Sequence, residues 1–181
     1  MQTYYVDAVH GNDSRPGIVE KAPWKTLKRA GGQVFQPGDR LFLKRGCAWN
    51  EGLVLRGRAP AGNPITLGTY GDGPRPRING GKDHAISARE PVAGWRISGL
   101  ELTSTNDSNP TRRITGGTCG VFFTQSQGSD YLAIDDCIIH DTSGPGIHLL
   151  ATGEPSPVFR NVTIERCEIF NASCGIQFHS H

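Results

Sequence analysis

Two short patterns recur in the second half of this 181-residue chain, and they constrain its fold more than any other feature. The first pattern, Ile-x-x-(Leu/Cys)-x-(Leu/Ile), begins at Ile97, Ile134 and Ile164. The second, Gly-(Val/Ile)-x-(Phe/Leu), begins at Gly120, Gly146 and Gly175, and residues 84–88 look like a degraded earlier copy. Self-similarity of this kind indicates that one small structural unit is stacked repeatedly on itself.

The spacing of the repeats limits how the units can be connected. The first pattern advances by 37 and then 30 residues (97 to 134 to 164), and the second by 26 and then 29 (120 to 146 to 175). Hairpin turns join antiparallel strands, whereas here the same strand type returns after each interval. A coil whose turns stack like onto like explains this, with neighbouring strands about 4.8 Å apart. The repeats therefore predict an all-β parallel β-helix, with a β-sandwich as the alternative.

Alternation along the strands predicts which side chains face outward. Ile147 and Leu149 should point into the core and His148 away from it. The polar pairs at residues 135–136 and 165–166 interrupt the alternation of the first pattern, as a tight corner would. The outward positions of the second pattern are Ser87, Phe122, His148 and Gln177, with His179 one position beyond Phe178.

The first half of the chain predicts a cap and the first coils. Trp24, Leu27, Ala30 and Val34 are spaced as one apolar face, which predicts a short capping helix within residues 24–34. The chain has 24 Gly and 12 Pro residues, and each costs a helix interior about 1 to 3 kcal/mol, which disfavours helix-rich folds. We expect one domain over 1–181, with the cap and first coils in 1–83 and regular coils in 84–181. Strands are expected at 40–44, 53–55 and 64–67, and turns over 68–81.

Several motifs of the first half resemble a known group of proteins. They are Tyr4-Tyr5-Val6-Asp7 with Gly11-Asn12-Asp13, Pro23-Trp24-Lys25-Thr26-Leu27, Pro37-Gly38-Asp39 with Leu41-Phe42-Leu43, and Gly62-Asn63-Pro64-Ile65-Thr66. Over roughly residues 4–103 the chain resembles the N-terminal region of bacterial right-handed parallel β-helix proteins. That group includes pectate-lyase-like and alginate-lyase-like polysaccharide lyases. The resemblance implies right-handed winding and a secreted or periplasmic location, although no signal peptide is present in this chain.

Members of this group usually have more coils than 181 residues supply. The resemblance therefore implies that the chain is truncated at its C-terminus, or that its last coil is covered by a partner subunit. An uncapped coil presents unpaired strand edges, so self-association through that end is also expected.

The resemblance further implies a reaction class. Lyases of this group remove a proton next to a uronate carboxylate with a Lys, Arg or His base, and acidic side chains often hold Ca²⁺. We therefore expect a polysaccharide lyase-like protein acting on acidic polysaccharide, with Ca²⁺ as a candidate cofactor. No acidic cluster repeats across the coils, so no metal ligand is assigned. The alternatives are a non-catalytic module for glycan binding or surface attachment, and a glycoside hydrolase. A hydrolase needs two carboxylates about 5 to 9.5 Å apart, and Glu101 and Glu168 share a ladder position two coils apart.

The candidate site residues lie on the outward face of the second pattern. His148 is the candidate general base near neutral pH. His140 and Asp141 are placed in the preceding turn, where they would orient or charge His148. Phe122, Gln177 and His179 are candidate substrate-binding residues. The alternative is an ordinary solvated histidine, with the pair at 140–141 only capping a turn.

Charge and cysteine content bear on partners. With 19 Lys and Arg against 17 Asp and Glu, the net charge is +2, and nothing in it demands nucleic acid. No apolar run approaches the roughly 18 residues of a membrane helix, so no membrane span is expected. The resemblance implies a polysaccharide as the partner. The five cysteines form no Cys-x-x-Cys pair, which disfavours zinc. Cys137 and Cys167 share a pattern position one coil apart and should form a stack of buried thiols. Cys119 and Cys174 should lie two coils apart, too far to bridge.

Overall fold

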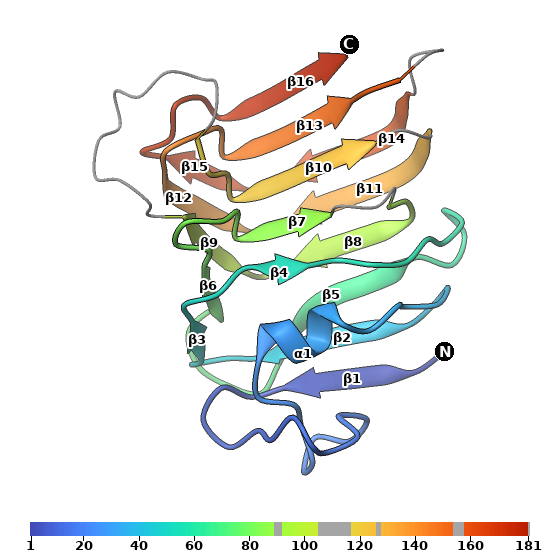
Figure 1. The fold of residues 1–181 in the computed structure, drawn as a ribbon, viewed down its shortest axis with the longest axis vertical. Coiled ribbons are helices and arrows are strands. Elements are labelled where there is room, and N and C mark those ends of the chain that lie inside the picture. The colour runs from blue at the N-terminus through green and yellow to red at the C-terminus, as the bar shows by residue number, and fades with distance from the viewer. Residues whose placement is uncertain (89–91, 105–116, 126–127, 154–157, 181) are drawn as a thin grey trace.

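The computed structural model describes residues 1–88, 92–104, 117–125, 128–153 and 158–180, and these form three parallel sheets with one short helix (Figure 1). Sheet A has the order β1 (Thr3–Val6), β2 (Arg40–Lys44), β5 (Ile65–Tyr70), β8 (Trp95–Ser98), β11 (Ser129–Asp135) and β14 (Phe159–Glu165). Sheet B has the order β3 (Ala48–Trp49), β6 (Arg77–Asn79), β9 (Glu101–Ser104), β12 (Ile138–Thr142) and β15 (Glu168–Phe170). Sheet C has the order β4 (Leu53–Val54), β7 (Ile86–Ala88), β10 (Val121–Gln125), β13 (Ile147–Ala151) and β16 (Ile176–Ser180).

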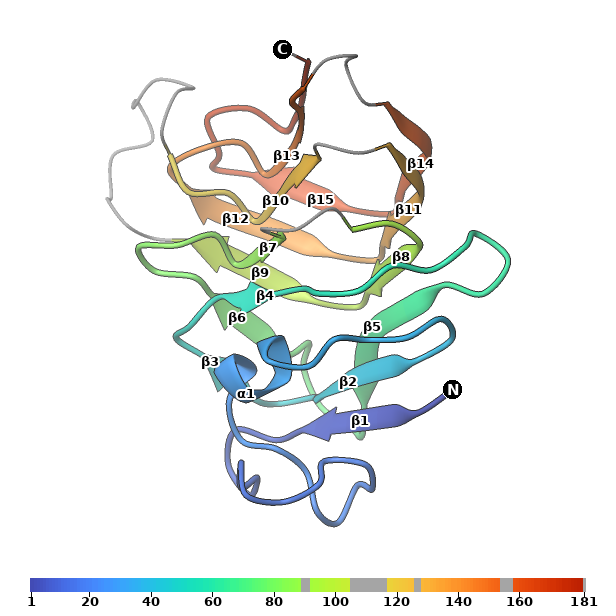
Figure 2. The same cartoon turned by 45° about the vertical axis from the view of Figure 1, so that its right-hand side comes forward.

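From β2 onward the chain passes through sheets A, B and C in turn and then repeats the same circuit. We call one such circuit a coil. Each strand pairs in parallel with the strands of the coils before and after it, so residues of adjacent coils lie side by side (Figures 1 and 2). This nearly all-β arrangement is consistent with a parallel β-helix, as the repeats predicted.

The strand register confirms the predicted alignment of the repeats. In sheet A, Ile134 pairs with Ile97 on one side and with Ile164 on the other. In sheet C, Phe122 pairs with Ser87 and with His148, and His148 pairs with Gln177. Residues about thirty apart in sequence are therefore neighbours in space. The β-sandwich alternative, which needs antiparallel pairing, is wrong.

Inward side chains and tight corners shape each coil. Ile134, Ile147 and Leu149 are fully buried, as the alternation predicted. Asp136 and Arg166, both at the predicted corner between sheets A and B, have φ angles of 52° and 51°. This left-handed conformation is unfavourable for residues other than Gly, so the corner depends on the packed coils around it.

The capping helix is shorter than the sequence predicted. Helix α1 comprises Leu27–Gly31, and Trp24, Leu27 and Ala30 are buried as expected. The prediction was wrong for Val34, which is 46% exposed because the helix ends before it. Phe35 is buried instead, and its ring makes an edge contact with the Trp95 ring at 5.6 Å.

The interval 68–81 is not all turn. Strand β5 continues to Tyr70, and the three residues of β6 form a strand within the interval. Only Ile78 of β6 points into the core, so the sequence carries no alternation long enough to reveal a strand.

The prediction of a buried thiol stack is confirmed for Cys137 and wrong for Cys167, which is partly exposed. All five are free thiols; Cys119 and Cys137 are buried, and Cys167 and Cys174 are partly exposed. Cys167 belongs to the last coil, where Phe170 and Phe178 are 51% and 56% exposed. Self-association through this coil stays a prediction.

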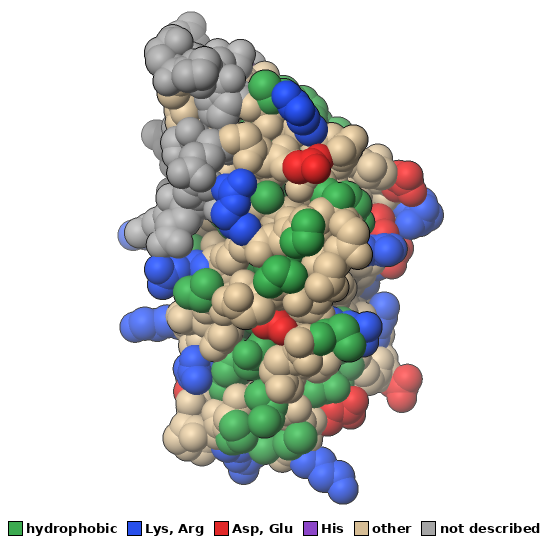
Figure 3. Space-filling view, turned by 90° about the vertical axis from the view of Figure 1, so that its right-hand side faces the viewer, with side chains coloured by type: hydrophobic (Ala, Val, Ile, Leu, Met, Phe, Trp, Pro, Cys, Tyr) green, Lys and Arg blue, Asp and Glu red, His purple; other side chains and the backbone are tan. Residues whose placement is uncertain are grey.

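Hydrophobic and basic side chains are unevenly distributed on the face shown in Figure 3. On the side shown in Figure 3, hydrophobic side chains gather mainly toward the N-terminal end, with Lys and Arg mostly along the edges. Among the described residues, no helix has the length and apolar character needed to span a bilayer.

Candidate functional site

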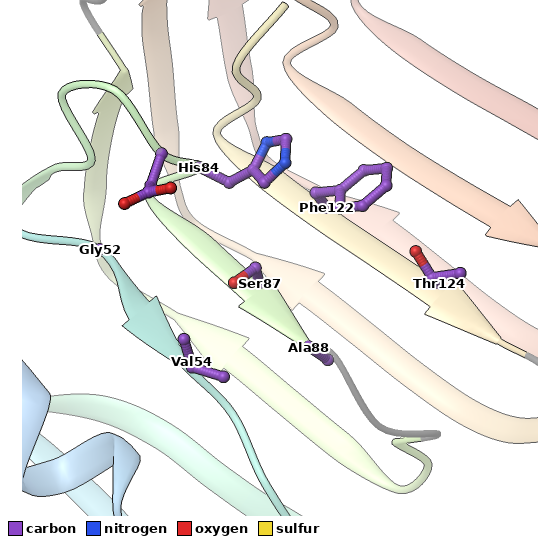
Figure 4. A pocket seen from close by; sticks show the side chains of 8 residues that line it. Gly52, Val54, His84, Ser87, Ala88, Phe122 and Thr124 are labelled. Atoms are coloured by element: carbon purple, nitrogen blue, oxygen red, sulfur yellow. The ribbon is translucent and has the colours of Figure 1, made fainter. Parts of the chain in front are cut away.

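A cavity of about 420 Å³ opens on the outer face of sheet C, over strands β4, β7 and β10 (Figure 4). Its lining consists of Gly52, Val54, Asp83, His84, Ser87, Ala88, Phe122 and Thr124. The hollow exists because small residues stand between larger ones. Ser87 lies in register between Val54 below and Phe122 above. At Gly52 an added Cβ would lie 2.4 Å from the His84 carbonyl oxygen, so only glycine permits this close approach.

A column of rings runs along sheet C at the edge of this cavity. The His84 and Phe122 rings stack with centroids 4.4 Å apart and planes inclined by 20°. Phe122 meets His148 edge-on at 5.2 Å, and His148 meets His179 at 5.4 Å. Because His84 covers part of one face of Phe122, that ring serves as an apolar wall of the cavity more than as an open platform.

His84 is anchored by the backbone of the next coil. The Cys119 N–H donates a hydrogen bond to His84 Nδ1 at 2.9 Å. Burial lowers the pKa of His84; the nearby His148 adds to this, and Asp83 opposes it. The imidazole is therefore held in its neutral form near pH 7.

His148, the predicted base, lies one coil beyond the cavity wall. Burial lowers its pKa, and the neighbouring His179 lowers it further. Its Nε2 atom is buried and has no hydrogen-bond partner among the described residues. Gln177 and His179 lie together in β16, with Gln177 Nε2 3.1 Å from His179 Nε2. Of the predicted site residues, Phe122 lines the cavity, while His148, Gln177 and His179 continue the same face away from it.

His140 and Asp141 lie elsewhere, and the prediction that they form a turn before His148 was wrong. Both residues belong to strand β12 of sheet B, where a register irregularity follows His140. His140 Nδ1 is 2.8 Å from Asp141 Oδ2, and its Nε2 is 3.3 Å from Glu101 Oε1. The His140 ring also stacks on Phe170 at 4.9 Å. Both imidazole nitrogens are thus engaged within sheet B and do not orient His148.

Sequence reasoning missed Asp83 and His84 as site residues. A signal was present, because the degraded repeat copy at 84–88 pairs in register with the later copies. With Ile86 opposite Val121, His84 falls at the position of Cys119, at the corner that leads into sheet C. A histidine there projects toward the cavity instead of standing in the outward row.

The carboxylates and metal ligands limit the chemistry of this face. Among the described residues that line the cavity, Asp83 is the one with a charged side chain. Glu101 and Glu168 flank Ile138 in sheet B, on a different face. Within the described ranges, no group of three His, Cys, Asp or Glu side chains is placed to hold a metal ion. The described lining offers one carboxylate, Asp83, whereas a Ca²⁺ site takes six to eight oxygen ligands, so these residues alone do not form one.

Comparison with known proteins finds similarity in sequence to a curated protein and in fold to solved structures. No protein-family model matches it. A lacto-N-biosidase of Bifidobacterium longum subsp. longum is 40% identical over 75 residues, which is 39% of this chain and 5% of that protein.

Two solved structures resemble the fold over nearly the whole chain. A GH136 lacto-N-biosidase from Eubacterium ramulus superposes with a TM-score of 0.77 at 22% identity, covering 98% of this chain and 34% of that one. A rhamnogalacturonan lyase superposes with a TM-score of 0.64 at 15% identity, covering 98% of this chain and 54% of that one. The chain shares its fold with these proteins, and it spans only about a third and about half of their lengths.

Proposed function

We propose that the protein is carbohydrate-active and that the cavity on sheet C binds a saccharide. The observation that carries the proposal is the mixed lining of the cavity. Phe122 and Val54 supply apolar walls for the C–H faces of a sugar, while Asp83, Ser87 and Thr124 supply groups for its hydroxyls. A concave site with apolar walls and a few polar groups is the usual form of a small-molecule site, and 420 Å³ falls within the usual range.

The charge of the lining favours a neutral sugar over a uronate. A uronate carboxylate would face Asp83, and the described residues of the lining include no Lys or Arg to compensate. His84 does not supply the missing positive charge, because burial lowers its pKa. We therefore favour a neutral saccharide, which departs from the acidic polysaccharide expected from the sequence.

For the reaction, we propose hydrolysis of a glycosidic bond. The relative that is 40% identical over 75 residues is named a lacto-N-biosidase, and a GH136 lacto-N-biosidase shares the fold. Asp83 is a carboxylate at the cavity, and a hydrolase of the usual kind pairs two. The described lining supplies one carboxylate, Asp83, which is not a complete catalytic pair. In this proposal the described residues therefore bind a sugar unit next to the bond that is cleaved.

A polysaccharide lyase is the second candidate, and His148 favours it. A base that works near neutral pH must be unprotonated there, and burial lowers the pKa of His148. The fold is also shared with a rhamnogalacturonan lyase. In this candidate Ca²⁺ would have to be bound with substrate oxygens, because the lining alone does not hold it. Either function suits a secreted or periplasmic protein. We also propose that the coil is right-handed, because about 98% of parallel crossover connections have that hand.

Three measurements on the same protein separate these readings. Calorimetric titration with lacto-N-biose and with a uronate oligosaccharide measures binding. New reducing ends measure hydrolysis, and new ultraviolet absorbance of an unsaturated uronate, with and without Ca²⁺, measures elimination. We expect binding of the neutral disaccharide at the sheet C cavity. Binding of uronate alone, with elimination that His148→Ala abolishes, would replace this proposal by the lyase. No binding of any probe would remove the saccharide site.

A further inference from the structure

We propose that His84 is a specificity-determining residue of the saccharide site, presenting Nε2–H as a fixed, uncharged hydrogen-bond donor to an oxygen of the bound sugar. The inference rests on the proposed function, because it names what that cavity selects. His84 begins the degraded repeat copy at 84–88 but was not among the site residues predicted from the sequence.

The tautomer of His84 follows from its hydrogen bond. A backbone amide can only donate, so the 2.9 Å contact from the Cys119 N–H makes Nδ1 an acceptor. A neutral imidazole carries one ring proton, which must then lie on Nε2. No hydrogen-bond partner for Nε2 occurs among the described residues, and Nε2 is not among their buried, unpaired atoms. The donor is therefore available to a ligand.

The position of the ring is also fixed. Phe122 stacks on it at 4.4 Å, which restricts rotation of the imidazole out of the cavity. The backbone on either side of the ring is held by neighbours: the Asp83 carbonyl accepts from Ser104 Oγ at 2.7 Å, and the Ala85 N–H donates to the Cys119 carbonyl at 3.0 Å. A preorganised donor loses little conformational freedom on binding, so it discriminates between ligands more sharply than a mobile side chain.

The chemistry of the donor defines the class of ligand. A neutral N–H pairs with a hydroxyl or an amide carbonyl oxygen, and offers no full charge to a carboxylate. Asp83, in the same lining, accepts hydrogen bonds and offers none when ionised. The site therefore selects a neutral sugar that presents an acceptor toward His84 and a hydroxyl donor toward Asp83.

Two substitutions separate the two nitrogens of His84. His84→Asn places an amide oxygen near the position of Nδ1, so it keeps the acceptor for Cys119 and loses the donor at Nε2. His84→Gln places an amide nitrogen near the position of Nε2, so it keeps the donor and leaves the buried Cys119 N–H without an acceptor. Each variant is titrated with lacto-N-biose by calorimetry and melted thermally at pH 7.5, in the full chain.

We expect opposite results for the two variants. His84→Asn should bind lacto-N-biose on the order of tenfold more weakly than the wild type, with little change in Tm. His84→Gln should bind within about threefold of the wild type, with a Tm lower by about 5 °C because an amide is left unpaired. In the wild type, ¹⁵N NMR should show a protonated Nε2 and an unprotonated Nδ1 for His84.

Other outcomes overturn the inference in distinguishable ways. If the wild type binds and His84→Asn binds equally well, His84 does not select the ligand, and the proposed function survives. If NMR shows the proton on Nδ1, the donor does not exist and the inference fails whatever the affinities. If the wild type binds no neutral saccharide, the proposed function fails and His84 loses its ligand with it.

Discussion

Sheets B and C each carry a histidine stacked on a phenylalanine of the next coil, and the two pairs have different surroundings. In sheet B, His140 lies 4.9 Å from Phe170, and both its nitrogens face carboxylates. At the start of sheet C, His84 lies 4.4 Å from Phe122; its Nδ1 accepts from a backbone amide, and its Nε2 has no hydrogen-bond partner among the residues that the structure describes. Ring stacking is common to both pairs, so it does not mark a site. The pairs differ because His84, which lines the cavity, has an Nε2 atom with no hydrogen-bond partner among the described residues.

The largest expected effect comes from removing the two phenylalanines separately. Phe122→Ala removes a wall of the cavity and the support of His84, so affinity for lacto-N-biose should fall about 10- to 100-fold in calorimetric titration. Phe170→Ala is the matched control and should leave the affinity unchanged. Equal losses in the two variants would mean that the sheet C face is not the binding site.

The next effect is on stability and belongs to sheet B. His140→Ala leaves Glu101 and Asp141 without their shared partner and should lower the free energy of unfolding by about 1 to 2 kcal/mol. The expected loss of unfolding free energy is no larger because the Asp141 side chain is 42% exposed, so water screens its interaction with His140. Urea unfolding measures the loss, with the exposed His10→Ala as a control that should change little. Saccharide affinity should be unaffected; a large fall in affinity would contradict the structural role of His140.

A smaller effect is expected at the charged group of the cavity. Asp83→Asn replaces an ionic acceptor by a neutral one, so affinity for lacto-N-biose should fall about two- to fivefold. Affinity for a uronate oligosaccharide should not fall, because a repulsive charge is removed. The exposed Asp72→Asn serves as a control for the change in net charge. If Asp83→Asn weakens uronate binding instead, the preference for a neutral sugar is wrong.

The smallest effect is a pH dependence confined to sheet C. Burial lowers the pKa values of His84 and His148 below their ordinary value of 6.5 in the folded protein. The unfolded chain then binds more protons than the folded one as the pH falls below about 6.5, so this stability is complete above that pH and decreases below it. We expect the unfolding free energy to decrease between pH 7 and pH 5. The double variant His84→Asn/His148→Gln should show a shallower decrease, and an unchanged slope would show that neither histidine causes it.

Two paired carboxylates, Asp7 and Asp141, lose their stabilising effect at a more acidic pH than the histidines. Lys44 and backbone amides of Val9 and His10 hold the pKa of Asp7 at about 2 despite its burial. His140 and Asn171 lower the pKa of Asp141 as well. The stability that these groups contribute is lost only in more acidic solution, as the pH falls through their lowered pKa values.

The sequence predicted the stacking of the coils well, because repeated residues keep the same role in each coil. The register that places Ile134 between Ile97 and Ile164 follows directly from the spacing of the pattern. Prediction from the sequence failed where a segment lacks periodicity. Strand β6 has a single inward residue, Ile78, between Pro- and Gly-rich neighbours. The prediction also placed Val34 in a helix that ends at Gly31.

The candidate site was predictable in part, and for a physical reason. Phe122 and His148 stand on the regular outward row, so alternation found them. His84 lies at a corner, where no alternation applies, and its hydrogen bond to the Cys119 amide depends on the approach of two coils. His140 was misplaced because its partner Glu101 is 39 residues away in sequence. The register predicts which residues of neighbouring coils are opposite each other, but it does not predict which side chains then form hydrogen bonds.

The in-register pairing of sheet C has a consequence for how such a surface changes during evolution. Deleting residues 120–145 would remove β10, β11 and β12, one strand from each sheet, and leave all three ladders able to rejoin. Ile147 would then pair with Ile86, and His148 would stand where Phe122 stood, against Ser87. A single loss of one repeat would exchange an apolar wall for a second imidazole beside His84. Ligand preference on this scaffold is therefore open to revision by recombination between repeats as well as by point mutation.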